Sequence, residues 1–160
     1  MAKKPGKPQE HRSIARNKKA RHTYEVLEEL ECGVLLQGTE VKSLRAGEAS
    51  IQEAYARIKG GELWLVGATI AEYRHGNVHN HAPRRDRKLL AHKREIERWS
   101  RSVKERGITL VPLELYFSGS RVKALIGLCR GKKLHDKRQV QRERDDKRAM
   151  DRAAAAARRG

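Results

Sequence analysis

A run of eight residues, Gly131 to Arg138 (GKKLHDKR), holds the densest set of chemically capable side chains in the sequence. Its charged and titratable members are Lys132, Lys133, His135, Asp136, Lys137 and Arg138. Lysine and arginine can hold phosphates, an imidazole can stack on a base or hydrogen-bond to it, and a carboxylate can orient a base or a cation. So many charges of both signs cannot be buried together. The run therefore predicts an exposed contact surface for nucleic acid.

The excess positive charge of the chain lies in its two ends. The 160 residues include 37 Lys or Arg and 20 Asp or Glu, which gives a net charge of +17. Residues 1–21 and residues 130–160 each carry +7, and residues 22–129 carry only +3. Basic ends on a nearly balanced body favour a polyphosphate partner, because each neutralised phosphate releases counterions. Nucleic acid is therefore favoured over an anionic membrane.

The sequence disfavours several classes of protein. No window approaches the roughly 18 apolar residues that span a bilayer, and the N-terminus lacks the apolar run of a signal peptide, so we expect a soluble, cytoplasmic protein. The chain has no Walker A loop and no GxSxG motif, so neither an enzymatic activity nor a cofactor is predicted. Cys32 and Cys129 belong to no CxxC pair. Small buried thiols are favoured over a disulfide or a metal site.

The chain divides into an arm, a body and a tail. Residues 1–21 contain two prolines and eight cations, which predicts a flexible basic arm. Residues 22–130 carry the apolar patterns of a folded domain. Residues 131–160 form a basic tail rich in helix formers. An isolated helix of this length is marginal in water, so we expect the tail to be mostly disordered when free and helical on binding.

Alternating apolar residues predict antiparallel strands in the body. The first apolar pattern, at residues 23–36, predicts a bent strand or two strands with a bulge near Cys32 and Gly33. Residues 51–58 and 62–66 form a hairpin about a Gly-Gly turn, which residues 68–73 extend. Residues 108–117 and 121–130 form a final hairpin, in which Pro112 predicts a bulge or an edge.

Two helices and one polar loop complete the body. Residues 38–47 predict a short helix with Thr39 as N-cap and Gly47 as its stop. Residues 88–106 predict the main helix, with an apolar stripe of Leu89, Ile96, Trp99 and Val103 and with Lys93, Arg94, Arg98 and Arg101 outward. The loop at residues 75–87 contains His75, His79 and His81, which could share a metal ion. No carboxylate or thiolate stands beside them and two arginines would repel a cation, so an exposed basic loop that could contact RNA is favoured.

The expected fold is mainly β with helices. Several short strands with turns at regular intervals predict a small antiparallel barrel that resembles an OB-fold, with one main and one short helix and a C-terminal tail. Aromatic residues are only 4% of the chain, too few for a row of stacking platforms, so shape and phosphate contacts to a folded RNA are expected to dominate.

Five segments, in one order, resemble the SmpB family of small bacterial proteins that bind tmRNA. They are NKKARH (17–22), GTEVKSLRAG (38–47), RKLL (87–90), TLVPLELYF (109–117) and GKKLHDKR (131–138). The resemblance covers about residues 14–148. It implies a non-enzymatic role in trans-translation, the rescue of ribosomes stalled on messages without a usable stop codon.

The resemblance also implies site residues and partners. The barrel would contact the tRNA-like domain of tmRNA through Asn17, Lys18, Lys19, His22, Glu31, Lys88, Leu90 and Lys123. The tail residues Lys132, Lys133, His135, Asp136, Lys137 and Arg138 would meet ribosomal RNA in the empty decoding centre and mRNA channel. Elongation factor Tu and alanyl-tRNA synthetase would be partners of the same RNA. A ribosomal protein or a general RNA chaperone is the alternative, because either would share the basic arms and the small barrel.

Overall fold

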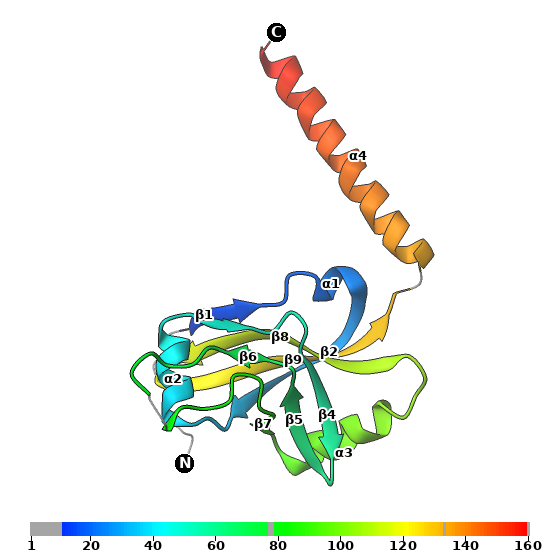
Figure 1. The fold of residues 1–160 in the computed structure, drawn as a ribbon. Helices are drawn as coiled ribbons and strands as arrows, with labels where there is room; N and C mark the ends of the chain where they lie inside the picture. The colour runs from blue at the N-terminus through cyan, green and yellow to red at the C-terminus, as the bar shows by residue number, and fades with distance from the viewer. Residues whose placement is uncertain (1–10, 77–78, 133, 160) are drawn as a thin grey trace, which may run out of the picture.

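A seven-stranded antiparallel β-sheet forms the centre of the fold (Figure 1). The computed structural model describes residues 11–76, 79–132 and 134–159. The strands are β1 (His11–Arg16), β2 (Tyr24–Val34), β3 (Ala49–Ser50), β4 (Tyr55–Lys59), β5 (Glu62–Val66), β6 (Thr69–Ile70), β7 (Arg87–Leu90), β8 (Ile108–Ser118) and β9 (Arg121–Gly131). The helices are α1 (Ala20–Thr23), α2 (Gly38–Arg45), α3 (Lys93–Ser102) and α4 (Leu134–Arg159).

Seven strands pair in the order β1-β8-β4-β5-β7-β2-β9, and β8 also pairs with β9. All of the described pairings in this sheet are antiparallel. β3 and β6 form a separate two-stranded sheet. The expectation of a mainly β fold with helices is confirmed, and its likeness to an OB barrel stays a prediction.

The hairpin of β8 and β9 follows its sequence pattern closely. Val122, Ala124, Ile126 and Leu128 are all buried, because alternate residues of a strand point to the same face. The pairing register shifts between Pro112 and Glu114. Pro112 has no N–H to give to the neighbouring strand, so a bulge fits this position. The bulge predicted at Pro112 is confirmed.

The bulge in β2 lies elsewhere than predicted. The register with β9 shifts between Val26 and Glu28, whereas Cys32 and Gly33 are regularly paired with β9. Leu27 is the extra residue and is 40% exposed. The bulge expected near Cys32 and Gly33 is therefore wrong.

Helix α2 begins two residues earlier than its predicted N-cap implies. Its N-cap is Gln37 rather than Thr39, and the backbone N–H of Gln37 donates to Glu40 Oε1 at 2.9 Å. This bond requires Glu40 at the third helical position, which sets the start of the helix at Gly38. The stop at Gly47 is confirmed, because Gly47 has a φ of 74° and its N–H donates to the carbonyl of Leu44.

The segment predicted as the main helix contains a strand and a shorter helix. Residues 87–90 form β7, and α3 begins only at Lys93 after the N-cap His92. Arg87 and Leu89 face the interior while Leu90 is exposed, so burial along this segment has the period of two of a strand. The position of Leu89 also fits the helical spacing of the predicted stripe by chance. Within α3, Ile96 and Trp99 are buried as predicted, and Lys93, Arg94, Arg98 and Arg101 are exposed.

Two further segments are less regular than predicted. The strand expected from residue 51 begins only at Tyr55, because Ile51 and Ala54 form a turn closed by a bond from the Ala54 N–H to the Ile51 carbonyl. The segment expected at residues 68–73 is a strand only over Thr69–Ile70. In the turn, Ile51 and Ala54 bury their side chains in the core.

In the described part of the chain, the N-terminal segment joins the sheet. Residues 11–16 form β1, which pairs with β8, and residues 20–23 form α1. Ile14 and Ala15 pack against the core, which is a reason for this segment to join the sheet. A flexible arm extending to Arg21 is thus wrong for residues 11–21, and residues 1–10 lie outside the described part of the chain.

A buried ion cluster joins α2 to β7 and to the loop before it. Glu40 and Arg87 are both fully buried, and Arg87 Nε donates to Glu40 Oε2 at 2.6 Å. Arg85 Nε donates to Glu40 Oε1 at 3.1 Å. Arg87 also donates to the carbonyls of Ala68 and Pro83 at 2.8 and 3.0 Å. These bonds compensate the desolvation of both charges and fix the loop against the sheet.

Both cysteines are free and, as predicted, buried. They lie in two different clusters of the core. Burial raises the pKa of Cys32 to about 12 and that of Cys129 to about 11. Neither thiol is therefore ionised near neutral pH, which agrees with a packing role.

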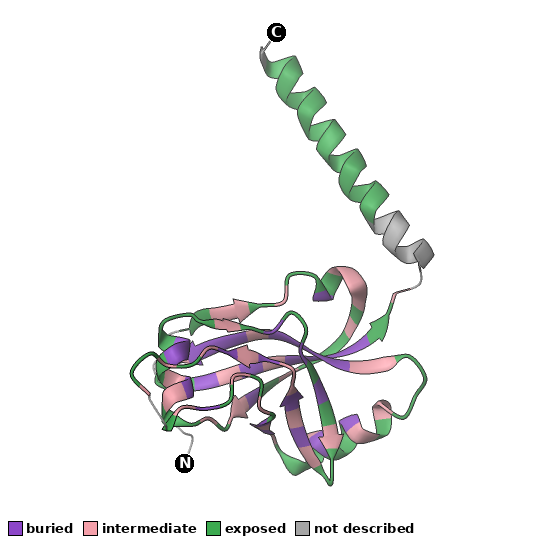
Figure 2. Ribbon diagram, in the orientation of Figure 1, coloured by how far each residue is buried: buried purple, intermediate pink, exposed green. Residues whose placement is uncertain are grey.

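Helix α4 extends away from the sheet (Figure 1), and its side chains from residue 141 to residue 158 are exposed (Figure 2). The segment before it is attached to α1, because Lys132 Nζ donates to the Arg21 carbonyl at 2.9 Å. The helical form of the tail agrees with its composition, and its state free in solution stays a prediction. No helix in the described ranges is long and apolar enough to cross a membrane.

Candidate nucleic-acid interface

Glu31 and Lys123 lie together on the outer face of β2 and β9. Lys123 Nζ is 3.2 Å from Glu31 Oε1, and the hydroxyl of Tyr116 on β8 donates a hydrogen bond to Glu31 Oε2. The hydrogen bond from Tyr116 lowers the pKa of Glu31, and the opposing effect of burial is smaller, so the pKa lies below its ordinary value. Glu31 is therefore an ionised acceptor with a lysine beside it, the arrangement that can receive a base amino group next to a phosphate.

His11 of β1 adds an aromatic ring to this group. The ring stacks on Tyr116 with 4.3 Å between the ring centres and an interplanar angle of 16°. His11 Nε2 lies 3.0 Å from Glu114 Oε1. Neither His11 nor Tyr116 is predicted from the sequence, because the pairing of β1 with β8 joins residues about 100 positions apart and leaves no local signal.

Leu90 and Lys88 lie on the adjoining strand β7. Leu90 is paired with Gly33 and is 50% exposed, an unusual amount for a large apolar side chain. A Cβ at Gly33 would lie 3.3 Å from the Leu90 Cβ, so the absence of a side chain at Gly33 leaves room for Leu90 over β2. Lys88 Nζ lies 3.0 Å from Glu62 Oε1 of β5. The structure thus brings Glu31, Lys123 and Leu90 together around Gly33.

The remaining candidates of the body lie at α1. Asn17 fixes this segment to β8, since its N–H donates to the Leu113 carbonyl at 2.9 Å and its Nδ2 donates to the Pro112 carbonyl at 3.3 Å. Lys18 and Lys19 are exposed beside it. His22 is partly buried, and its Nδ1 has no hydrogen-bond partner among the described residues. Across the parts of the chain that are described, no hydrogen bond or ion pair joins this group to Glu31, Lys123 or Leu90.

Of the six predicted tail residues, the structure describes the side chain of Lys132 alone. Lys132 lies beside α1 through its bond to the Arg21 carbonyl. Lys133 lies outside the described residues, and the side chains of His135, Asp136, Lys137 and Arg138 are not described although their backbone belongs to α4. The tail motif therefore stays a prediction from the sequence.

The histidine loop differs from the exposed basic loop that was expected. His81 is buried, with Nδ1 2.9 Å from Thr39 Oγ1 and Nε2 2.9 Å from the Ile70 carbonyl. His75 is exposed and lies edge-on to Tyr73. In the described part of the loop, His81 is thus a packing residue. Across all of the described ranges, no group of three or more His, Cys, Asp or Glu residues could hold a metal ion.

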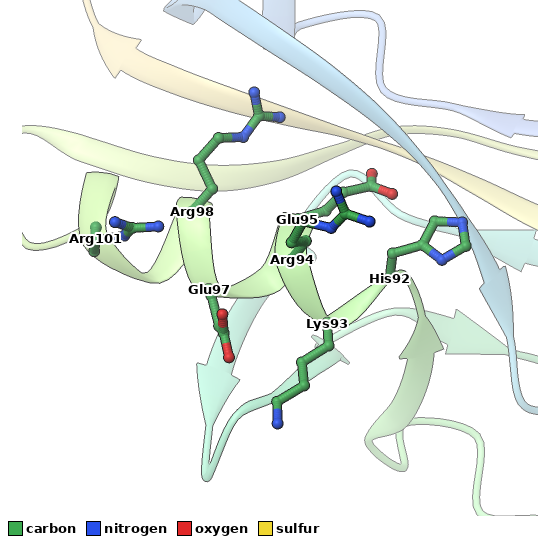
Figure 3. Close-up of a pocket in the computed structure, with 7 residues that line it drawn as sticks. All are labelled: His92, Lys93, Arg94, Glu95, Glu97, Arg98 and Arg101. Atoms are coloured by element: carbon green, nitrogen blue, oxygen red, sulfur yellow. The ribbon is translucent and has the colours of Figure 1, made fainter.

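A hollow of about 950 Å³ lies on α3, apart from the residues above (Figure 3). It is lined by His92, Lys93, Arg94, Glu95, Glu97, Arg98 and Arg101. The lining carries both signs of charge, and Arg98 lies 3.3 Å from Glu28 Oε2. None of the tmRNA contacts predicted from the sequence lines this hollow, so the group around Gly33 is the stronger candidate.

Most of the chain, including both groups of candidate residues, matches one protein family. The family model described as SmpB protein matches residues 14–156. The chain belongs to the SmpB family.

Relatives of the SmpB chain match over nearly their full length. The SsrA-binding protein of Kineococcus radiotolerans is 56% identical over 140 residues, covering 88% of this chain and 90% of its own. That of Mycolicibacterium vanbaalenii is 50% identical over 154 residues, covering 95% and 93%. A chain of the solved structure "tmRNA-SmpB: a journey to the center of the bacterial ribosome" is 50% identical, with a TM-score of 0.63 and coverage of 74% of this chain and 84% of that chain. The SmpB assignment therefore rests on whole sequences and on the fold as well as on short motifs.

Proposed function

We propose that this SmpB protein binds the tRNA-like domain of tmRNA and delivers it to stalled ribosomes for trans-translation. The family match over residues 14–156 carries the proposal. Two relatives with at least 50% identity are SsrA-binding proteins, and the similar solved structure concerns tmRNA-SmpB and the bacterial ribosome. The protein would act in the cytoplasm as an RNA-binding protein and not as an enzyme.

In this proposal, the sheet binds and recognises tmRNA. Glu31 offers an acceptor, Lys123 a phosphate contact and Leu90 an apolar surface that can pack on a base or a ribose. Lys18 and Lys19 are exposed cations on a segment that Asn17 anchors to β8. Anchored cations can contact phosphates in a fixed register, which favours recognition of a folded RNA over nonspecific attraction.

The tail directs the complex to the ribosome. The sequence predicts a body at residues 22–130 with a basic segment on each side. In this proposal, the tail from residue 131 contacts ribosomal RNA in the decoding centre and mRNA channel. Its contact residues are Lys132, Lys133, His135, Asp136, Lys137 and Arg138. Helix α4 projects from the sheet (Figure 1), a shape that suits insertion into a channel. Elongation factor Tu and alanyl-tRNA synthetase would be indirect partners that bind the same RNA.

Binding measurements across a salt series test whether the sheet binds tmRNA without the tail. The full chain and a version ending at Lys132, which keeps β9 and the bond to the Arg21 carbonyl, are titrated with tmRNA and with an unrelated structured RNA. We expect both proteins to prefer tmRNA at moderate salt with similar affinities. A preference that vanishes as the salt rises, or that is lost with the tail, would indicate binding by counterion release and would favour a general RNA chaperone.

A pair of exposed leucines tests the proposed face. Leu90→Ala removes the apolar side chain beside Gly33, and Leu27→Ala removes one of similar exposure at the β2 bulge. We expect Leu90→Ala to weaken tmRNA binding about tenfold, a typical loss for one anchoring side chain, and Leu27→Ala to leave it nearly unchanged. Equal effects of the two changes would contradict the assignment of the RNA-binding face.

A further inference from the structure

A separate hollow lies where β1 meets the end of α2. It has a volume of about 340 Å³ and is lined by Arg12, Arg45, Phe117, Gly119 and Ser120. Two arginines from different elements therefore face one space, and no carboxylate lines it. Two neighbouring cations without an acid between them repel each other and attract an anion.

The arginine side chains have few partners within the protein. Arg12 donates one hydrogen bond, from Nη2 to the Arg45 carbonyl at 3.2 Å. The guanidinium of Arg45 makes no hydrogen bond or ion pair within the described residues. Each guanidinium carries five N–H donors in a planar fork that matches two oxygens of a phosphate. Most of these donors are therefore free to bind a ligand.

The rest of the lining suits a phosphodiester. Phe117 is 7% exposed and gives an apolar wall, against which a ribose can pack. Ser120 is exposed at the turn between β8 and β9 and offers a hydroxyl. A site with two cations, a hydroxyl and an apolar wall fits the backbone of a nucleic acid better than a small free anion.

This hollow is separate from the group around Gly33. Arg12 is paired with Phe117, and His11 precedes it on β1 and stacks on Tyr116. Because successive side chains of a strand point to opposite faces, Arg12 and His11 lie on opposite faces of β1. An RNA strand bound in this hollow would contact the protein at the edge of the sheet.

We propose that Arg12 and Arg45 form a second RNA-binding site, which holds a backbone phosphate at the edge of the sheet. The site goes beyond the proposed tmRNA face but rests on the proposed function in one respect, because its partner is one of the two RNAs named there. The phosphate belongs either to tmRNA or to ribosomal RNA.

The full chain carrying Arg45→Gln tests the site. This change removes one charge and breaks no bond of the described residues. Arg106→Gln is the matched control, because Arg106 is also exposed and also has no partner among the described residues. Arg12→Lys keeps the charge and loses the planar fork, so it provides a second variant whose fold is little changed.

Affinities are measured over a salt series with three probes: the tRNA-like domain of tmRNA, small ribosomal subunits without tmRNA, and an unrelated structured RNA. We expect Arg45→Gln to weaken binding to one of the first two probes by about three- to tenfold and to reduce the salt slope by about one, with an intermediate effect of Arg12→Lys and none of Arg106→Gln. A loss with tmRNA assigns the phosphate to tmRNA, and a loss with subunits assigns it to ribosomal RNA. Equal affinities of the Arg45→Gln and Arg106→Gln variants for both probes overturn the site. The wild-type preference for tmRNA over the unrelated RNA tests the proposed function separately.

Discussion

Replacing Glu40 by Gln is the sharpest test of how the loop before β7 is held. The change keeps the size of the side chain and the capping position in α2, so it removes mainly the charge. Arg87 would then remain fully buried with its Nε facing a neutral amide. Removing one partner of a buried ion pair costs about 3–5 kcal/mol, and the retained amide oxygen places Glu40→Gln near about 3 kcal/mol.

Urea unfolding followed by circular dichroism measures this loss. With a slope of about 2 kcal/mol per molar urea, a loss of 3 kcal/mol lowers the midpoint by about 1.5 M. Arg57→Gln is the control, because Arg57 and Asp86 form an exposed pair with 3.5 Å between Nη2 and Oδ2. Exposed pairs contribute less than about 1 kcal/mol, so this variant should unfold close to the wild type.

The pH dependence supplies a second criterion for the same variant. Burial raises the pKa of Glu40, and hydrogen bonds from Arg85, the Gln37 N–H and Arg87 lower it, with a net shift below its ordinary value of 4.5. A lowered folded-state pKa contributes stability that is present above the unfolded pKa and is lost as the pH falls through the folded pKa. The stability curves of wild type and Glu40→Gln should therefore converge in acid. A loss below about 1 kcal/mol at pH 7, or curves that stay parallel, would refute the role given to the buried pair.

Three further predictions concern other parts of the chain. Tyr116→Phe should raise the pKa of Glu31 toward its ordinary value, because it removes the largest lowering contribution, and a carboxyl pKa unchanged in NMR titration would contradict this. Ala149→Pro should reduce ribosome rescue and the helix content of the tail while tmRNA binding persists, and unaffected rescue would contradict a helical tail. Gly107→Ala should destabilise the fold by about 1 kcal/mol because Gly107 has a φ of 85°, whereas Gly38→Ala, in open space on α2, should not; equal midpoints in urea would contradict this.

Elements with a local signal could be predicted from the sequence. The hairpin of β8 and β9 has an alternating apolar face on β9, a Ser-Gly-Ser turn and a proline at its bulge, all within about two dozen residues. The buried stripe of α3 and the stop of α2 at Gly47 are likewise set by neighbours in the sequence. Such features depend on side-chain period and backbone freedom, which the sequence contains directly.

Features that depend on distant pairing could not be predicted. From the sequence, β1 is predicted as part of a basic arm, because its alternating pattern is short. Its backbone partners lie on β8, far away in the sequence. Arg87 reads as a loop cation because its partner Glu40 lies 47 residues away. His81 is predicted to lie in an exposed loop for the same reason, because its partners, Thr39 and the Ile70 carbonyl, are distant in the sequence. In each case a polar side chain is buried by contacts that have no local pattern.

The acid among the candidate RNA contacts illustrates what the structure adds. Glu31 alone would repel a phosphate, and the family resemblance that places it among the RNA contacts does not say how that charge is offset. Lys123 offsets that charge at 3.2 Å, and the Tyr116 hydroxyl occupies the other oxygen, so the carboxylate is held in one orientation and stays ionised. A fixed acceptor beside a cation can distinguish a base edge from a phosphate, which two lysines could not do. Selectivity at this face would therefore come from the Glu31 group, and affinity from the surrounding cations.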